Sequence, residues 1–259
     1  MARKRSNKGP WFWRGTIVVM LSSVFGLFAV AAFNEPPPLD PDTQCRVDLN
    51  HPAHTVLLVD QSDPFNPNDI DWVRALVDEE ARTIPKYGRL TVMMPNAARP
   101  YDPAVVFARC SPGSSAQANP LLSNPRMVED TWRDTFYEPL IGDVEKVLSS
   151  TQQPASPLSE ALYAIADRAD FKAGRENRRL VLVSDLMQHS GDFSFYRAGA
   201  DSEAFSNSPL AENQPDLAGV EVVARIVPRQ DYDLPLKDVK AFWESYFTAS
   251  GVASFGSVN

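Results

Sequence analysis

Two apolar runs that each stop at an acidic residue predict two buried strands. Residues 55–59 read Thr-Val-Leu-Leu-Val and lead into Asp60. Residues 179–183 read Arg-Leu-Val-Leu-Val and lead, one residue later, into Asp185. A continuous Val/Leu run is typical of a strand covered on both faces, as in parallel sheets that lie between helices. Ligands of such folds bind beyond the carboxyl ends of the strands, so the acids that follow both runs are candidate site residues.

The rest of the hydrophobic pattern alternates between helices and strands. A helix capped by Asn68 or Asp69 and ended by Pro85 is predicted from apolar residues that recur on one face. A short link between strands at 90–94 and 104–109 indicates an antiparallel pair. Further predicted elements are a helix over 128–144 bent at Pro139, a helix from Ser156, a strand over 220–227 and a helix over 236–250. The pattern predicts an α/β fold, a Rossmann-like three-layer sandwich with a mostly parallel central sheet and one antiparallel edge strand.

The first 50 residues predict a membrane anchor followed by a spacer. Residues 1–14 form a basic head, and residues 15–33 carry no charge over a length that crosses a bilayer as a helix. The basic head places the N-terminus in the cytoplasm and the domain at 51–259 outside it. The alternative is a cleaved signal peptide, because Ala29-Val30-Ala31 resembles a cleavage site. The Pro-rich residues 34–50 are expected to form a stiff spacer.

The charge balance disfavours nucleic-acid binding. The chain has 25 basic and 33 acidic residues, and five of the basic ones lie in the first 14 residues. Subtracting these five leaves 20 basic against 33 acidic residues, a net charge of −13 for the remaining chain. A surface of this sign repels phosphate backbones. We therefore expect protein partners in or at the membrane, reached through the anchor at residues 15–33, and no nucleic acid.

The two cysteines, Cys45 and Cys110, both fall on the expected extracytoplasmic side, where a disulfide persists. One bridge between them is the simplest pairing, and two unrelated buried thiols are the alternative. The sequence has no Asn-x-Ser/Thr acceptor, which favours a bacterial setting over a glycosylated ectodomain. We expect a single-pass protein of the bacterial inner membrane with a periplasmic C-terminal domain.

A hydroxyl residue between the two strands completes a candidate cation site. Ser156 precedes Pro157 and an apolar helical stripe, so its plainest role is a helix N-cap with Pro157 at the first helical position. The strand-end aspartates favour a further role. Asp60 and Ser62 lie two residues apart, so a turn there presents a carboxylate and a hydroxyl to one hard cation.

With these residues the chain resembles the von Willebrand factor type A family. That family's metal-ion-dependent adhesion site combines an Asp-x-Ser-x-Ser turn after the first strand, a Thr at a helix start and an Asp after the fourth strand. Asp60 and Ser62 match the first Asp and Ser of the turn. Ser156 stands where the family has its Thr, and Asp185 matches the last Asp. The resemblance covers roughly residues 55–250 in element order.

The resemblance departs from the family at one position. Pro64 stands where the second Ser is expected and offers no hydroxyl, so Asp63 is the candidate to compensate. The resemblance implies a site for Mg²⁺ or Mn²⁺ with an open position for a partner's carboxylate. It also puts Cys45 and Cys110 at the sheet edge opposite the metal, where a bridge would close a long loop.

A long loop at residues 187–218 follows the second strand-end aspartate. It carries a histidine and three aromatic residues just beyond Asp185, namely His189, Phe193, Phe195 and Tyr196. Loops of this kind carry binding residues, so this one is expected to form part of a recognition surface.

These features predict a membrane-anchored extracytoplasmic protein-recognition domain within an envelope-associated complex. One alternative is a metal-dependent hydrolase, because a hard cation at a sheet edge also serves hydrolysis. A metal-free scaffold subunit is the other, and Pro64 is its main support. The sequence has no Gly-x-Ser-x-Gly elbow, His-Glu-x-x-His motif or phosphate loop, and its three histidines have no evident triad partners. We therefore do not expect an enzyme.

Overall fold

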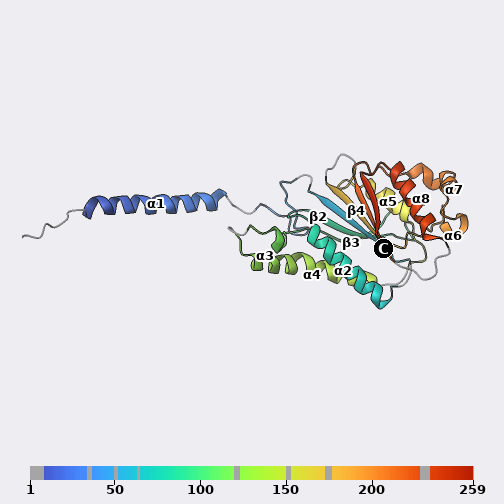
Figure 1. The fold of residues 1–259 in the computed structure, drawn as a ribbon, viewed down its shortest axis with the longest axis horizontal. Coiled ribbons are helices and arrows are strands. Elements are labelled where there is room, and N and C mark those ends of the chain that lie inside the picture. Colours follow the sequence, from blue (N-terminus) through green and yellow to red (C-terminus); the bar gives the residue numbers. More distant parts are fainter. Residues whose placement is uncertain are drawn as a thin grey trace, which may run out of the picture. The chain divides into compact units, whose positions relative to one another are not determined.

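The computed structural model describes residues 9–33, 37–49, 52–62, 65–119, 123–149, 153–172, 177–227 and 234–258. The chain divides into two compact units, Met1–Pro38 and Leu39–Asn259. The first unit contains one long helix, α1 (Gly9–Phe33), drawn in blue in Figure 1. Across the part of the chain that the structure describes, no helix has both the length and the apolar character that a membrane crossing needs. The expected span at residues 15–33 is thus helical, but its membrane crossing is unsupported.

The second unit is built on one sheet. Within the described residues its six strands lie in the order β3-β2-β1-β4-β5-β6. Every neighbouring pair is parallel except β2 with the edge strand β3, as the short link between them predicted. The mixed α/β class with one antiparallel edge strand is therefore confirmed. The strands are β1 (His54–Val59), β2 (Arg89–Met94), β3 (Ala104–Cys110), β4 (Arg178–Ser184), β5 (Glu221–Ile226) and β6 (Ser254–Val258).

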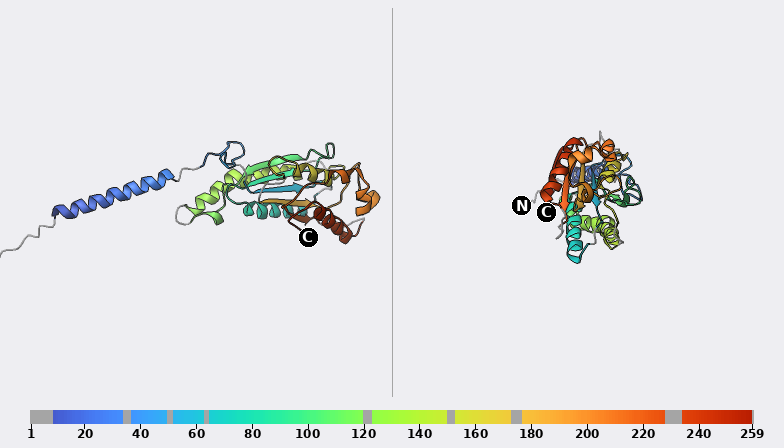
Figure 2. Two further views of the ribbon diagram at one scale, coloured as in Figure 1. Left: turned by 90° about the horizontal axis from the view of Figure 1, so that it is seen from above. Right: turned by 90° about the vertical axis from the view of Figure 1, so that its right-hand side faces the viewer.

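Helices cover both faces of the sheet, as the continuous apolar runs predicted. Val56 and Leu58 of β1 pack into one core, and Leu57 and Val59 pack into the other. Figures 1 and 2 show the sheet between these two groups of helices. The first core is covered by α5 (Leu158–Ala166), α6 (Phe195–Ala198), α7 (Ser202–Ser206) and α8 (Leu236–Ala249). The second is covered by α2 (Pro67–Thr83), α3 (Pro125–Trp132) and α4 (Glu138–Leu148).

Helix α2 begins earlier than the sequence indicated. Its N-cap is Asn66, and neither Asn68 nor Asp69 has that role. The Asn66 side chain accepts hydrogen bonds from the backbone N–H groups of Asn68 and Asp69, at 2.9 and 3.1 Å. The Asp69 carboxylate accepts in return from the Asn66 N–H at 3.1 Å, which completes a capping box. Pro67 favours this earlier start, because proline fits the first helical position.

The helix expected over residues 128–144 is interrupted before Pro139. A π-helical stretch, Arg133–Tyr137, joins α3 to α4. Such a stretch inserts extra chain into the turn and changes the direction of the side chains that follow. The aromatic residues of this segment are core residues as predicted, since Trp132 and Phe136 are 1% and 0% exposed.

Two segments of the compact unit differ from the prediction. The parallel edge strand β6 was not predicted, since its sequence Ser-Phe-Gly-Ser-Val has no continuous apolar run. Pairing with β5 and contact of Phe255 with Phe247, at 4.9 Å between ring centroids, hold it in place. The unit also begins at Leu39 instead of residue 51, so the last part of the expected spacer belongs to it.

The disulfide between Cys45 and Cys110 is confirmed, with the two Cα atoms 4.8 Å apart. It joins the 39–49 segment to the end of β3, and the N–H of Cys110 also donates to the carbonyl of Thr43 at 2.8 Å. Cys110 pairs with Arg89, the first residue of β2. The chain therefore enters the unit at the edge of the sheet where the parallel strands begin.

Candidate functional site

The candidate site lies at the carboxyl ends of the parallel strands, where β1 and β4 end, and this end of the sheet is called the site edge. These strands are parallel neighbours, and Val59 pairs with Val183. The N–H of Asp60 then donates to the carbonyl of Val183 at 2.9 Å, which holds the ends of the two strands together. The two apolar runs thus deliver Asp60 and Asp185 to one edge, as their sequence positions indicated.

Asp60 is the centre of a group of hydroxyls. Its Oδ2 accepts hydrogen bonds from Oγ of Ser156 at 2.6 Å, Ser184 at 2.9 Å and Ser62 at 3.2 Å. Its Oδ1 accepts from the backbone N–H of Ser62 at 3.1 Å. The side chain is only 4% exposed. Burial raises the pKa of the Asp60 carboxyl, and the hydrogen bonds from Ser156, Ser184 and Ser62 oppose that rise.

Ser156 reaches this group from a different position than the sequence predicted. Helix α5 begins at Leu158, with Pro157 as its N-cap, so Ser156 is not the cap. Ser156 instead forms a two-residue bridge with His189, through backbone hydrogen bonds of 2.9 and 2.8 Å between the two residues. This pairing holds Ser156 beside the end of β1 and frees its hydroxyl to donate to Asp60.

Asp185 lies one residue beyond β4 and is 4% exposed. Its Oδ1 accepts from the N–H of Met187 at 3.0 Å. The hydroxyls of Ser62, Ser156 and Ser184 therefore converge on Asp60, and Asp185 lies at the same edge because its strand ends there. Asp63 and Pro64, the remaining two positions of the expected turn, lie outside the described residues.

Ser184 belongs to the site and was not singled out from the sequence. Side chains alternate between the two faces of a strand, and the β1–β4 register places Ser184 beside Asp60. Counting by twos from Val56 and Leu58 puts Asp60 on the face covered by α5, and Ser184 shares that face with Leu182. The register between the two strands would have identified it.

The loop after β4 is held in a strained shape at the site. Leu186 has a φ of 66°, which a side chain with a Cβ rarely adopts. Two hydrogen bonds secure it: its N–H donates to Ser184 Oγ at 2.8 Å, and its carbonyl accepts from Trp243 Nε1 of α8 at 2.8 Å. The same loop is tied to α5, since Gln188 accepts from the Ser159 N–H at 2.9 Å. The loop after β4 is thus held in place by α5 and α8, which cover the same face of the sheet.

A small pocket opens beside the hydroxyl group, with a volume of about 190 Å³. It is lined by Ser62, Gln153, Pro154, Ala155, Ser156, Met187, His189 and Tyr196. Two of the loop residues expected at a recognition surface, His189 and Tyr196, are therefore found here, and Tyr196 is 52% exposed. Phe193 and Phe195 are core residues instead, since they are 5% and 1% exposed and pack against α8.

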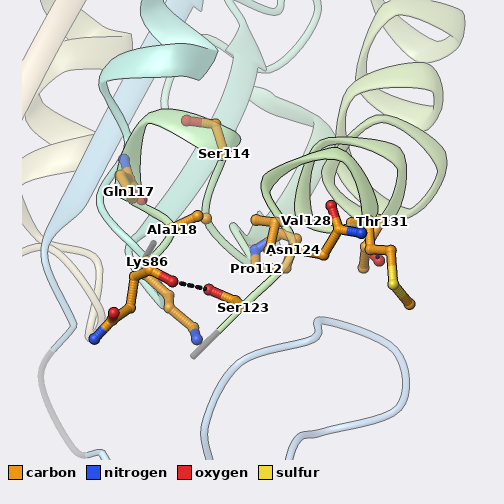
Figure 3. A pocket seen from close by; sticks show the side chains of 12 residues that line it. Lys86, Pro112, Ser114, Gln117, Ala118, Ser123, Asn124, Val128 and Thr131 are labelled. Atoms are coloured by element: carbon orange, nitrogen blue, oxygen red, sulfur yellow. Dashed lines mark hydrogen bonds between the residues drawn. The ribbon is translucent and has the colours of Figure 1, made fainter. Parts of the chain in front are cut away.

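A larger pocket of about 640 Å³ lies away from this site. Figure 3 shows it between the chain after β3, which carries Ser114 and Ala118, and the start of α3, with its N-cap Asn124 and its residue Val128. β3 ends where the parallel strands begin. This pocket therefore lies near the opposite edge of the sheet and contains none of the predicted site residues.

The donor set at Asp60 suits a hard cation. A carboxylate and hydroxyls are oxygen ligands, which Mg²⁺ and Mn²⁺ prefer. However, this set of ligands carries little negative charge, since within the described residues its carboxylates are those of Asp60 and Asp185. In the part of the chain that the structure describes, no group of three or more His, Cys, Asp or Glu side chains is placed to hold a metal.

Comparisons with known proteins identify no family and only distant structural similarity. No family matches the sequence, and no curated protein matches it. Similar solved structures include the pilus adhesin SpaC from Lactobacillus rhamnosus GG in its open conformation, with a TM-score of 0.43, 10% identity and coverage of 84% of this chain and 29% of that chain. Another structure of this adhesin has a TM-score of 0.42, 10% identity and coverages of 83% and 29%. The chain spans less than a third of the adhesin, and so low a likeness assigns no function. A von Willebrand factor type A-like fold is compatible with the observed sheet but not established.

Proposed function

We propose that the compact unit is an extracytoplasmic protein-recognition domain that binds an acidic group of a partner through Mg²⁺ or Mn²⁺. The observation that carries this proposal is the convergence of Ser62 and Ser156 on Asp60 beside a small pocket at the carboxyl edge of the sheet. Asp60, Ser62, Ser156 and Asp185 would hold the cation, with Asp63 as a further sequence-based candidate. The cation would supply positive charge for a carboxylate, and the pocket wall would supply specificity.

The position of the site within the compact unit supports a recognition domain. The chain enters the unit at Leu39 and is fastened by the disulfide at one edge of the sheet, whereas the candidate site lies at the other edge. Within the compact unit, the entry of the chain and the candidate site therefore lie at opposite ends of the strands. The membrane anchor at residues 15–33 and the periplasmic location of the domain rest on the sequence alone and are part of this proposal.

The test is a titration with MgCl₂ and MnCl₂ followed by thermal unfolding. A ligand that binds only the folded state at 100 times its Kd stabilises by about 2.7 kcal/mol, which raises the Tm of a domain this size by several degrees. We expect that metal-dependent rise in wild type and its loss in Asp60→Asn and Asp185→Asn. Asp192→Asn, which changes an exposed acid of the same loop, is the matched control and should keep the rise. Equal responses in all four proteins would refute the metal site.

A metal-free scaffold is the second candidate, and one observation favours it. Asp60 Oδ2 already accepts three hydroxyl hydrogen bonds within the protein, and the expected second hydroxyl of the turn is replaced by Pro64. A scaffold predicts no metal-dependent change in Tm, together with a loss of stability in Asp60→Asn. Turnover of ester substrates in the presence of Mg²⁺ would instead favour the hydrolase.

A further inference from the structure

His189 is fixed at the wall of the small pocket by contacts on several sides. Its backbone forms bridges with both Ser156 and Ser194. Its Nδ1 lies 2.9 Å from Ser194 Oγ, and its ring packs edge-on against Tyr196 with 5.3 Å between the centroids. The imidazole of His189 therefore has a defined orientation, and His189 lines the pocket.

The hydrogen bond to Ser194 determines which ring nitrogen carries the proton. Ser194 is 1% exposed, and within the described residues its hydroxyl has no other hydrogen-bond partner than His189 Nδ1. A buried hydroxyl hydrogen is costly to leave unpaired, so Ser194 donates to Nδ1. The ring proton is then on Nε2, and among the residues that the structure describes Nε2 has no partner. His189 thus offers one unused N–H donor at the pocket.

An N–H donor close to a candidate cation site matches the chemistry of a carboxylate. A carboxylate has two oxygens, so one can bind the cation while the other accepts a hydrogen bond. Without the cation, the acidic residues Asp60 and Asp185 at the same edge disfavour binding of the partner's negatively charged carboxylate. The pocket of about 190 Å³ has room for a short side chain.

We propose that His189 is a specificity-determining residue, which donates from Nε2 to the second oxygen of the partner's carboxylate. This rests on the proposed function, because the cation must hold the first oxygen. Ser194 is the positioning residue, since it fixes the tautomer and the ring orientation. The ligand class is thus an acidic side chain in preference to its neutral amide.

The test uses the full chain saturated with MgCl₂, with sodium acetate as the carboxylate probe and acetamide as its neutral counterpart. In wild type, binding is followed by the ¹H and ¹⁵N signals of the His189 ring, and in every protein it is followed by the backbone ¹H and ¹⁵N signals of Ser62 and Ser156 at the same pocket. We expect acetate, and not acetamide, to shift these signals in a saturable way. A hydrogen bond to a charged group predicts that His189→Phe weakens acetate binding by about tenfold or more. His189→Gln, which restores an N–H donor, should recover most of the affinity.

The possible failures are distinguishable. If wild type and His189→Phe bind Mg²⁺ and bind acetate equally well, the role of His189 is refuted while the proposed function stands. If wild type does not bind Mg²⁺, the proposed function fails and this inference fails with it. The wild-type ring signals give a test that needs no variant: a proton on Nδ1 instead of Nε2 would overturn the assignment.

Discussion

Removal of the disulfide is the perturbation whose magnitude follows most directly from the structure. The bridge joins Cys45 to Cys110 across a sequence separation of 65 residues. Loop-closure entropy for a loop of that length corresponds to about 4 kcal/mol of stability at 25 °C, and measured bridges commonly deliver about 2–4 kcal/mol. We expect Cys45→Ala/Cys110→Ala to lose an amount in that range, because the unfolded chain regains the freedom that the bridge removes.

The assay is equilibrium unfolding in urea, comparing oxidised wild type, reduced wild type and the double variant. Cys110 is 1% exposed, so its replacement also removes packing, and reduced wild type is the control that keeps this packing. Reduced wild type and the double variant should unfold at similar, lower urea concentrations. If oxidised and reduced wild type differ by less than about 1 kcal/mol, the loop-closure reasoning is wrong for this protein. A loss in the double variant alone would assign the effect to the buried Cys110 side chain.

Three further predictions concern buried polar groups. Burial lowers the pKa of His54 from 6.5 to about 4, so between these values the unfolded state binds the proton more readily than the folded state. The free energy of unfolding therefore decreases as the pH is lowered from 6.5 to 4. In urea unfolding, wild type should lose up to about 3 kcal/mol more than His54→Gln over this range. Trp243→Phe removes the indole N–H that Leu186 accepts and should cost about 1–3 kcal/mol by the same assay, with an unchanged far-UV spectrum. Arg179→Met leaves Glu80, 1% exposed, without its closest ion-pair partner and should lower the free energy of unfolding by about 3 kcal/mol. The double variant Arg179→Met/Glu80→Leu should lose less stability, because no unpaired buried charge remains. An equal or greater loss in the double variant would contradict this reasoning.

The sequence predicted the features that arise from local pattern. The Val/Leu runs identified β1 and β4, because a strand buried on both faces is apolar over most of its length. The short link identified the antiparallel edge strand β3. Cys45 and Cys110 were paired by counting, since the chain has no other cysteine.

The elements that the sequence did not predict depend on neighbours distant in the chain. β6 has little apolar character of its own and becomes a strand because β5 offers a free edge and Phe247 a surface for Phe255. The helix cap at Asn66 was missed by two residues, since several Asn and Asp residues there have similar capping strength.

At the candidate site, the sequence by itself determined that strand-end acids and a hydroxyl residue are present, and only the tertiary structure decided how they are arranged. Ser156 had the local signature of a helix cap, yet its bridge with His189 places its hydroxyl on Asp60. Ser184 joined the group through the β1–β4 register, which no local pattern encodes. The physical reason is that strand pairing and backbone bridges between distant segments set the distances between side chains, whereas propensity and periodicity act over a few neighbouring residues.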